Sequence, residues 1–351
     1  MIFHNQPTLG PIEASAARRV LESGWLAQGA EVAAFENEMC RLLGLPEAHA
    51  VALSSGTAAL FMALWALGGH ERKVAIPVYS CAALRNAVLM AGGKPMPVDV
   101  AEGTPNIDLV TAIKGGAELA ISAHMFGTPQ VWNSETMPIP VIEDCAQALG
   151  ARTDGRPVGL NGTVGIFSFY ATKMITSGGQ GGMLVSRDKS LVDVVRDYRE
   201  FDCRRDRNPR FNFQMTDLQA AVGRAQLSQL DHFLRRRRQA YAIYAAHGLP
   251  LWPGNLAPTI EPCHYRAILR VSDPGRVIAE LKRVHVRAIV PIEDWELLDD
   301  VDRFPMAKPL TYSTVSIPIY PSLSDSEIRM IADVLSELTN KICIHRKPLR
   351  D

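Results

Sequence analysis

The chain has 351 residues, 47% of them hydrophobic, and its 37 Lys and Arg residues equal its 37 Asp and Glu residues in number. This length exceeds what a single hydrophobic core usually supports, so we expect two domains. The balanced charge argues against a nucleic-acid-binding protein, which normally presents a basic face. It also provides no net field to attract an anionic substrate, so any anion must be bound by local groups.

Cysteine spacing and apolar runs limit the class of protein further. The six cysteines are scattered and include no C-x-x-C pair, which does not match common metal or redox sites. The first residues do not resemble a signal peptide, and no apolar run reaches the roughly 18 residues of a membrane span. We therefore expect a cytoplasmic protein with no membrane segment, no nucleic-acid partner and no metal site.

Strand and helix patterns alternate in the first half of the chain. A helix is expected at 31–43, where Val32, Phe35, Met39 and Leu42 share one face before Gly44. The alternation predicts crossover units and a mostly parallel sheet covered by helices on both faces. Two apolar runs, 165–171 and 182–186, lie too close together for a crossover helix, so we expect them to pair directly. Further buried strands are predicted at 49–54, 73–78, 94–100, 119–127 and 139–145, with helices at 58–67 and 80–92.

The second half begins with a long helical pattern from about residue 217 to 246, preceded by a capping-box signature at Thr216 and Gln219. Its RRRR run at 235–238 is interpreted as a solvated helix face. After Pro250 a smaller α+β unit is expected. Its predicted strands are 264–271, 286–292 and 313–320, and its predicted helices are 275–285 and 324–338, the latter capped by Ser324. We predict a large α/β domain at 1–248, with segment 1–30 packing on it, and a small α+β domain at 249–351.

Three motifs carry candidate chemistry, and the first is SSGTAAL at 54–60. Here a predicted strand ends, a small polar loop turns and an apolar helix begins. The free backbone N–H groups at Gly56 and Thr57, the positive end of the helix dipole and the Thr57 hydroxyl favour an anion such as phosphate. An ordinary strand-to-helix turn with a Ser cap would have the same pattern.

The second motif is VIEDCAQA at 141–148. Asp144 ends a buried strand, at the edge where open α/β sheets bind ligands. A buried carboxylate there is costly unless it pairs with a positive group. Gln147, three residues later, is placed to reach the same ligand. An N-capping aspartate is the alternative interpretation.

The third motif is GIFSFYATK at 165–173, in which a strand leads to Ser168 and then Lys173. A catalytic lysine must lie near other cations or away from water, because a protonated amine is a poor nucleophile. The following glycines, at 178, 179, 181 and 182, permit close backbone approach to a bound group. A surface lysine before a flexible turn would also fit this segment alone.

Taken together, a phosphate cradle, a buried acid and a lysine are what a pyridoxal 5′-phosphate site requires. The lysine amine forms a Schiff base with the cofactor aldehyde. The acid keeps the pyridine nitrogen protonated, so that the ring accepts electrons. The helix N-terminus neutralises the phosphate.

The sequence resembles the DegT/DnrJ/StrS family of sugar aminotransferases, which have the fold-type I architecture of aspartate aminotransferase. The resemblance covers most of the chain and rests on segments in the family's order. These are SGWLAQGAEVAAFE, SSGTAAL, GGKPMPVDV, VIEDCAQALGA, FSFYATK, MTDLQAAVGRAQLSQLD and SIPIYPSLSDSEI. It implies a mostly parallel mixed sheet between helices and a smaller C-terminal domain.

The resemblance also implies roles for individual residues. Lys173 would form the internal aldimine and move the proton, Asp144 would pair with the pyridine nitrogen, and Gln147 would contact the phenolic oxygen. Gly56, Thr57 and Ser168 would hold the phosphate. Asn212 would reach the phosphate in a second subunit, which implies a homodimer with shared active sites. The implied reaction is a ping-pong transfer from a donor such as L-glutamate to a nucleotide-linked keto-sugar.

Some positions depart from the family pattern. Cys81 stands where many members place an aromatic residue on the cofactor ring, and Tyr79 is a candidate substitute. Gln214 replaces a usual arginine, and Gln180 stands near a usual glutamate. Residues 290–298 do not resemble the family's substrate-facing segment. These changes leave the sugar, its nucleotide and the C3 or C4 position undetermined.

Two other functions remain open on the same scaffold. A pyridoxal-phosphate-dependent sugar dehydratase or deoxygenase usually replaces the lysine with histidine or adds clustered cysteines, and a non-catalytic binding protein would be expected to lose Lys173 or Asp144.

Other side chains have two interpretations each. His124 is expected to be a packed histidine rather than a ligand, and Cys263 with His264 suggests a metal only superficially. Trp295, with Glu293 and Asp294, is a candidate substrate wall. The arginines at 204, 205, 207 and 210 fit either a pyrophosphate site or a solvated loop.

Overall fold

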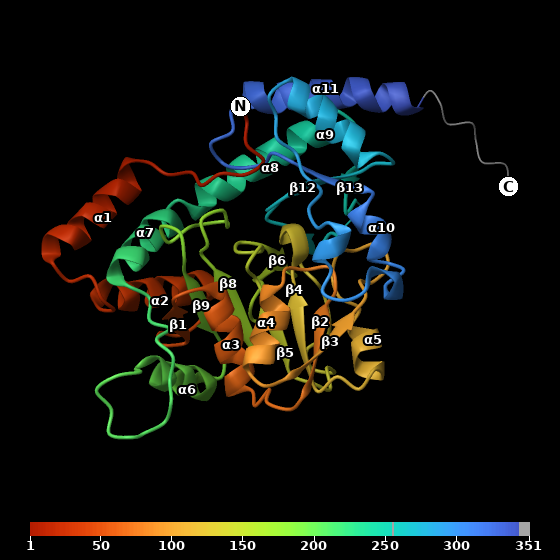
Figure 1. Cartoon of the computed structure of the whole chain (residues 1–351). Helices are drawn as coiled ribbons and strands as arrows, with labels where there is room; N and C mark the ends of the chain where they lie inside the picture. The colour runs from red at the N-terminus through yellow and green to blue at the C-terminus, as the bar shows by residue number, and fades with distance from the viewer. Residues whose placement is uncertain (255, 344–351) are drawn as a thin grey trace.

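The computed structural model describes residues 1–254 and 256–343, with side chains described through residue 338. Its central element is a seven-stranded sheet in the order β1-β9-β8-β5-β4-β2-β3, seen in the lower half of Figure 1. The strands are β1 (Ala50–Leu53), β2 (Lys73–Pro77), β3 (Lys94–Val98), β4 (Leu119–Ala123), β5 (Val141–Asp144), β8 (Val164–Ser168) and β9 (Gly182–Val185).

Strand direction sets where the loops gather. β9 is antiparallel to both β1 and β8, while β8, β5, β4, β2 and β3 pair in parallel. The expectation that β8 and β9 pair directly is confirmed, and the sheet is mixed. Because every strand except β9 runs the same way, the carboxyl ends of these strands lie at one edge of the sheet.

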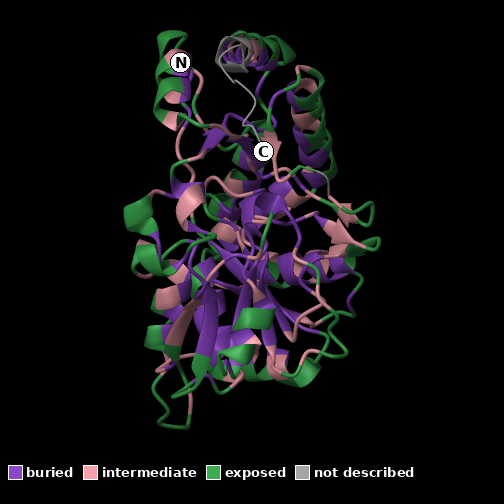
Figure 2. Ribbon diagram, turned by 90° about the vertical axis from the view of Figure 1, so that its right-hand side faces the viewer, coloured by how far each residue is buried: buried purple, intermediate pink, exposed green. Residues whose placement is uncertain are grey.

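Both faces of this sheet are buried, as predicted. In β1, Val51 and Leu53 face one apolar cluster while Ala50 and Ala52 face the other, because side chains alternate along a strand. The helices α3 (Gly56–Ala66), α4 (Ala83–Met90) and α6 (Lys189–Arg199) contribute to the first cluster, and α2 (Ala30–Leu43) and α7 (Asp217–Leu227) to the second. Figure 2 shows the buried sheet enclosed by more exposed helices and loops. The short helix α5 (Leu109–Lys114) follows β3.

A second sheet, β10-β12-β13, consists of β10 (Leu251–Trp252), β12 (Ala267–Arg270) and β13 (Thr314–Ile317). Its core includes Tyr244 of α8 (Leu230–Ala246), Leu281 of α9 (Pro274–Arg283) and Ile331 of α11 (Asp325–Cys343). Ser324 accepts the Glu327 N–H, so its predicted capping role is confirmed. The remaining elements are α1 (Pro11–Ser23), α10 (Lys308–Thr311), the three-stranded sheet of β6 (Arg152–Thr153), β7 (Arg156–Pro157) and β11 (Ile260–Glu261), and the 3₁₀ turns η1 (Met125–Gly127), η2 (Asp294–Glu296) and η3 (Val301–Arg303).

Two predictions about these elements are wrong. The single helix expected at 217–246 is divided into α7 and α8, because the Ser228 hydroxyl and the Gln229 amide both donate to the Ala225 carbonyl at the junction. The strand expected at 286–292 is absent, and Ile289 makes only an isolated bridge to Ser316. In the described part of the chain, no helix is both long and apolar enough to span a membrane.

Candidate active site

The sequence-predicted residues gather at the common carboxyl edge of the large sheet. Gly56 follows β1, Cys81 follows β2, Asp144 ends β5, and Ser168 ends β8 shortly before Lys173. A cavity of about 490 Å³ opens beside them. It is lined by Ser80, Cys81, Ala82, Arg85, Met125, Phe126, Gln147, Lys173, Tyr265, Arg266, Pro291, Ile292 and Trp295–Leu298. The site therefore joins the large sheet to β12 and to the segment before α10.

The N-terminus of α3 has the features of an anion cradle. The Ser55 hydroxyl caps the helix by accepting the Ala58 N–H at 3.1 Å, and Thr57 is exposed at the first turn. A Cβ atom on Gly56 would lie 2.8 Å from the Ser168 Cβ, so only glycine permits this contact between α3 and β8. Gly56, Thr57 and Ser168 are thus neighbours at a helix start whose N–H groups can bind a phosphate.

Asp144 ends β5, and Gln147 lies on the loop that follows it. Burial raises the pKa of Asp144, opposed by the Ala146 N–H and by the positive charge of Lys173. A buried carboxyl group of this kind is stabilised by a cationic partner such as a protonated ring nitrogen. The Gln147 side-chain oxygen accepts the Phe126 N–H at 2.7 Å, which leaves its NH₂ group as the donor.

Lys173 is carried on a tightly bonded hairpin between β8 and β9. Beyond the strand ends, Phe169 N donates to Gly181 O and Ala171 N to Gly179 O. Gly178 and Gly179 have φ angles of 72° and 130°, which glycine tolerates and other residues rarely adopt. The close approach at Gly182 is to the chain itself, since a Cβ atom there would lie 2.1 Å from the Ser55 carbonyl oxygen. This glycine run therefore shapes the hairpin and seats it against α3.

Tyr265 is a site residue that the sequence did not indicate. Its buried ring lies with its centroid 5.5 Å from the Lys173 Nζ and 5.6 Å from the Arg266 Cζ. Burial alone would raise the pKa of Tyr265, but the nearby charges of Lys173, Arg266 and Arg237 lower it overall. The predicted strand at 264–271 contained Tyr265 and Arg266, yet no pattern placed them beside Lys173.

A second unpredicted feature is a buried network around Glu143. Its carboxylate accepts backbone N–H groups from Gly159, Asn161 and Gly162 and contacts His124 Nε2 at 3.0 Å. The other ring nitrogen of His124 accepts the Gln130 N–H. His124 is therefore a packed histidine, as expected. Although Cys145 lies nearby, the His124 and Glu143 atoms that would bind a metal are already hydrogen bonded.

Cys81 and Tyr79 have different surroundings. Cys81 opens onto the cavity. Partial burial by the neighbouring residues raises the pKa of its thiol, and the negative charge of Asp144 raises it further. Tyr79 is fully buried, packs edge-on against Phe126 and hydrogen bonds to Thr314. Tyr79 therefore lies in the core and is not among the residues that line the cavity.

Asn212 lies apart from the cavity lining. It is exposed and caps its own chain by accepting the Gln214 N–H, while the next residue, Phe213, accepts the Ser54 N–H. In the loop before it, Arg204 and Arg210 form ion pairs with Asp197 and Asp206. These two arginines are thus neutralised within the chain.

Two further candidates carry no chemistry in this structure. Cys263 is buried with its pKa raised to about 12 by desolvation, and His264 stacks on Tyr241.

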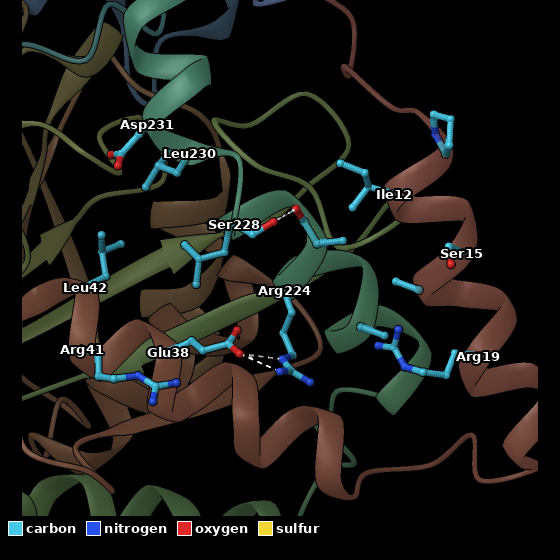
Figure 3. A pocket seen from close by; sticks show the side chains of 15 residues that line it. Ile12, Ser15, Arg19, Glu38, Arg41, Leu42, Arg224, Ser228, Leu230 and Asp231 are labelled. Atoms are coloured by element: carbon cyan, nitrogen blue, oxygen red, sulfur yellow. Dashed lines mark hydrogen bonds and ion pairs between the residues drawn. The ribbon is translucent and has the colours of Figure 1, made fainter.

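A larger hollow of about 930 Å³ lies between α1, α2 and α7 (Figure 3). None of the predicted site residues lines it, and its Arg224 is paired with Glu31 and Glu38.

Residues 7–336 match the model of the DegT/DnrJ/EryC1/StrS aminotransferase family. The chain belongs to this family. The sequence resemblance and the predicted fold class, a mostly parallel mixed sheet of the fold-type I kind, are therefore confirmed. The protein is an aminotransferase, and the cofactor of its family is pyridoxal 5′-phosphate.

Solved structures of similar proteins agree with this assignment. The aminotransferase TlmJ from Streptoalloteichus hindustanus is 27% identical with a TM-score of 0.89, over 98% of this chain and 100% of that one. DesV from S. venezuelae is 27% identical with a TM-score of 0.86, covering 96% and 95% of the two chains. The sugar aminotransferase CalS13 from Micromonospora echinospora is 25% identical with a TM-score of 0.87, covering 96% and 100%.

The residues present fit the cofactor. The Ser55 hydroxyl accepts the Ala58 N–H, so the N–H groups of Gly56 and Thr57 at the start of α3 can serve a phosphate, and Asp144 is a buried acid without an ion pair among the described residues. Lys173 lines the cavity beside these groups, and its positive charge works to lower the pKa of Asp144. These groups supply the anion cradle, the acid and the amine that pyridoxal 5′-phosphate requires.

Proposed function

We propose that the protein transfers an amino group from L-glutamate to a nucleotide-linked keto-sugar in a ping-pong cycle. The observation that carries this proposal is the meeting of Lys173, Asp144 and the α3 N-terminus at one sheet edge. The sugar is favoured because CalS13, which covers nearly all of this chain, is a sugar aminotransferase.

Each residue at the sheet edge has a distinct task in this proposal. Gly56, Thr57 and Ser168 hold the phosphate, and the buried Asp144 carboxylate holds a proton on the ring nitrogen. The Gln147 NH₂ group donates to the phenolic oxygen. Bound in this way, the cofactor supplies an electron sink. The Lys173 Nζ is the point of covalent attachment and, when free, the base that moves the proton between carbon atoms.

The outer part of the cavity is proposed as the keto-substrate site. Trp295 is 79% exposed and lines the cavity together with Glu296, whose carboxylate accepts the Glu293 N–H. A flat apolar ring beside a hydrogen-bonding acid suits a sugar hydroxyl and a sugar or base face. Glu293 and Asp294 support this turn and do not line the cavity.

The active form is proposed to be a homodimer in which Asn212 reaches the phosphate of the other subunit. Asn212 is exposed and lies outside the lining of its own cavity. Gln28 and Gln214 both donate to Glu200, and the exposed side chains of Trp25, Leu26 and Phe211 lie within a few residues of these two glutamines in the sequence. Exposed apolar groups of this kind are typical of an interface.

Unpaired thiols at Cys40, Cys81, Cys145, Cys203 and Cys263 are consistent with the proposed cytoplasmic location.

The test is a visible absorption spectrum of the purified protein, loaded with pyridoxal 5′-phosphate, during titration with L-glutamate. We expect a yellow band that bleaches as the amino group moves to the cofactor and returns when a keto-sugar accepts it. A yellow band that glutamate does not change would contradict the donor. Absence of any band after loading would contradict the enzymatic function.

A further inference from the structure

The cavity beside Lys173 is locally positive in a chain whose net charge is zero. The charged side chains lining it are Arg85, Lys173, Arg266 and Glu296. Cations therefore outnumber acids there, and a site of this kind attracts an anion even without a long-range field. Of the two arginines that line this cavity, Arg266 contacts the Tyr265 ring, which Lys173 also contacts.

Arg266 is held in place by groups that do not neutralise it. Its Nη1 atom lies 3.1 Å from His4 Nε2 and 3.4 Å from the Ser316 hydroxyl oxygen, and its guanidinium carbon lies 5.6 Å from the Tyr265 ring centroid. Burial, followed by the charges of Arg266 and Arg287, lowers the pKa of His4 to about 3. His4 is thus a neutral acceptor near pH 7. Among the described residues, no carboxylate forms an ion pair with Arg266.

The same aromatic ring relates Arg266 to Lys173. The Lys173 Nζ is 5.5 Å from the Tyr265 ring centroid, nearly the same distance as the Arg266 guanidinium. The N-terminal segment ties the two together, because Asn5 donates to the carbonyl of Thr172 while the adjacent His4 contacts Arg266. Because Arg266 and Lys173 also line the same cavity, an anion bound by Arg266 shares that cavity with the reacting amine.

We propose that Arg266 binds the α-carboxylate of the amino-acid donor and so determines that the donor is an amino acid. This inference rests on the proposed function. In an α-amino acid, the carboxylate and the amine are on the same carbon, so a cation near Lys173 matches their spacing. A nucleotide-linked sugar instead carries its phosphates at the anomeric carbon, several bonds from a C3 or C4 ketone. The guanidinium fork suits a carboxylate in a two-point contact.

Arg266 is accordingly a specificity-determining residue, and His4 is a positioning residue that acts through it. Arg85 lies elsewhere on the lining, where it donates to the Leu298 carbonyl at 3.3 Å on the Trp295 side of the cavity. Substituting Arg85 therefore tests whether the second substrate binds this cavity through a phosphate group.

The experiment compares Arg266→Gln with the wild type, and Arg270→Gln is the control. Arg270 ends β12, the strand that Arg266 directly precedes, but it lies over the Trp252 ring and does not line the cavity. In the spectral titration, Arg266→Gln should keep the yellow band and require roughly 10–100-fold more L-glutamate for half-bleaching, as expected for a lost charged hydrogen bond. Arg270→Gln should match the wild type. Equal half-bleaching concentrations for Arg266→Gln and the wild type would overturn the proposal.

Binding of unreactive anions, measured by calorimetry on the loaded protein, gives a readout that does not depend on turnover. Glutarate has the carboxylates of glutamate without its amine, and its affinity should fall in Arg266→Gln by a similar factor. If Arg266→Gln loses affinity for pyrophosphate while its affinity for glutarate is unchanged, Arg266 binds the second substrate. That result would overturn the proposal that Arg266 binds the donor carboxylate. Loss of pyrophosphate binding in Arg85→Gln but not in Arg266→Gln supports a cavity in which Arg85 binds a phosphate group and Arg266 binds the donor carboxylate.

One further variant and the behaviour of the wild type separate this inference from folding defects and from the proposed function. Arg266→Lys keeps the charge but loses the fork, so a half-bleaching concentration several-fold above that of the wild type is expected, and no change would count against the two-point contact. A wild type that shows no band or no bleaching contradicts the proposed function itself. A wild type that bleaches normally beside an unaffected Arg266→Gln contradicts only the Arg266 site.

Discussion

The cavity around Lys173 has one wall from the edge of the seven-stranded sheet and another from residues 291–298, and different forces order the two walls. On the sheet side, Asp144 and Lys173 follow strands whose backbone ladders and buried side chains fix their positions. On the other side, Trp295 lies on a single 3₁₀ turn with its ring exposed.

This difference separates the chemistry from substrate choice. A residue at the end of a buried strand cannot shift without disturbing the core, so it is suited to hold a cofactor. A side chain on a short exposed turn is replaced at little cost in stability, so it is suited to vary with the substrate. Changes on the sheet wall should therefore reduce reaction rate or stability, and changes on the turn should affect substrate affinity.

The largest effect is expected for Lys173→Ala on the sheet wall. Removing the amine removes both the attachment point and the proton-transfer base, and general acid–base catalysis alone contributes about 10²–10⁴-fold in rate. The spectrum of the variant should lack the yellow band, and amino transfer should fall by at least this factor. Near wild-type turnover in Lys173→Ala would show that the sheet wall does not carry the chemistry.

The next effect concerns stability. Glu143→Ala removes a buried carboxylate that accepts several backbone N–H groups and contacts His124. Removing the acceptor leaves these buried N–H groups unsatisfied, at about 1–3 kcal/mol for each group, a loss that urea unfolding would detect. Glu135→Ala, at an exposed position, serves as the control, and its expected change is below about 0.5 kcal/mol.

This Glu143 contribution should also depend on pH. Burial works to raise the pKa of Glu143, but hydrogen bonds from His124 and the backbone outweigh it, so the folded pKa is lowered below its usual value. A carboxyl group with a lowered folded pKa stabilises the protein above its unfolded pKa, about 4.3, and loses this contribution as the pH falls through the folded pKa. The difference in the free energy of unfolding between the wild type and Glu143→Ala should therefore decrease below about pH 4. A difference that increases on acidification would contradict the assigned charge state.

On the exposed turn, Trp295→Ala should raise the KM for the keto-substrate about 10-fold, since stacking of a base on an aromatic ring contributes roughly 1–3 kcal/mol. The kcat and the thermal midpoint should change little because the ring is largely exposed. Tyr312→Ala, another exposed aromatic change, is the control. A fall in kcat with unchanged KM would place Trp295 with the chemistry instead.

The smallest effect is expected for Cys81→Phe. The thiol opens onto the cavity, and the proposed cofactor position would let an aromatic ring there stack on the cofactor. An added aromatic contact of about 0.5–1.5 kcal/mol should tighten cofactor retention by roughly 2–10-fold, measured by dialysis of the yellow protein. Faster cofactor loss would show that the cavity beside Cys81 is too narrow for a ring.

Local patterns were sufficient to predict the sheet wall. Strand periodicity and the short spacing between 165–171 and 182–186 determine the mixed sheet, and the strand ends then place Gly56, Asp144 and Lys173 together. The break between α7 and α8 was not predictable in this way, because it depends on side chains of Ser228 and Gln229 that compete for a helix carbonyl.

The contacts missed by the sequence are those made across long separations. Glu143 precedes Asp144 on a buried strand, so alternation places it on the other face, but no local signal shows the loop at 159–162 that satisfies it. Arg266 likewise has the pattern of an ordinary strand residue. Its neutral partners, His4 and Ser316, come from opposite ends of the chain.

The hairpin formed by β8 and β9 has a further consequence for repeated turnover. Because hydrogen bonds at Phe169 and Ala171 hold the two arms together beyond the strands, the backbone of Lys173 is tethered on both sides. An amine on such a tether samples a small volume, so its effective concentration at the cofactor position greatly exceeds that of any free amine in solution. If Lys173 is the attachment point, as proposed, its return after each release would be intramolecular, and free amines would compete with it poorly.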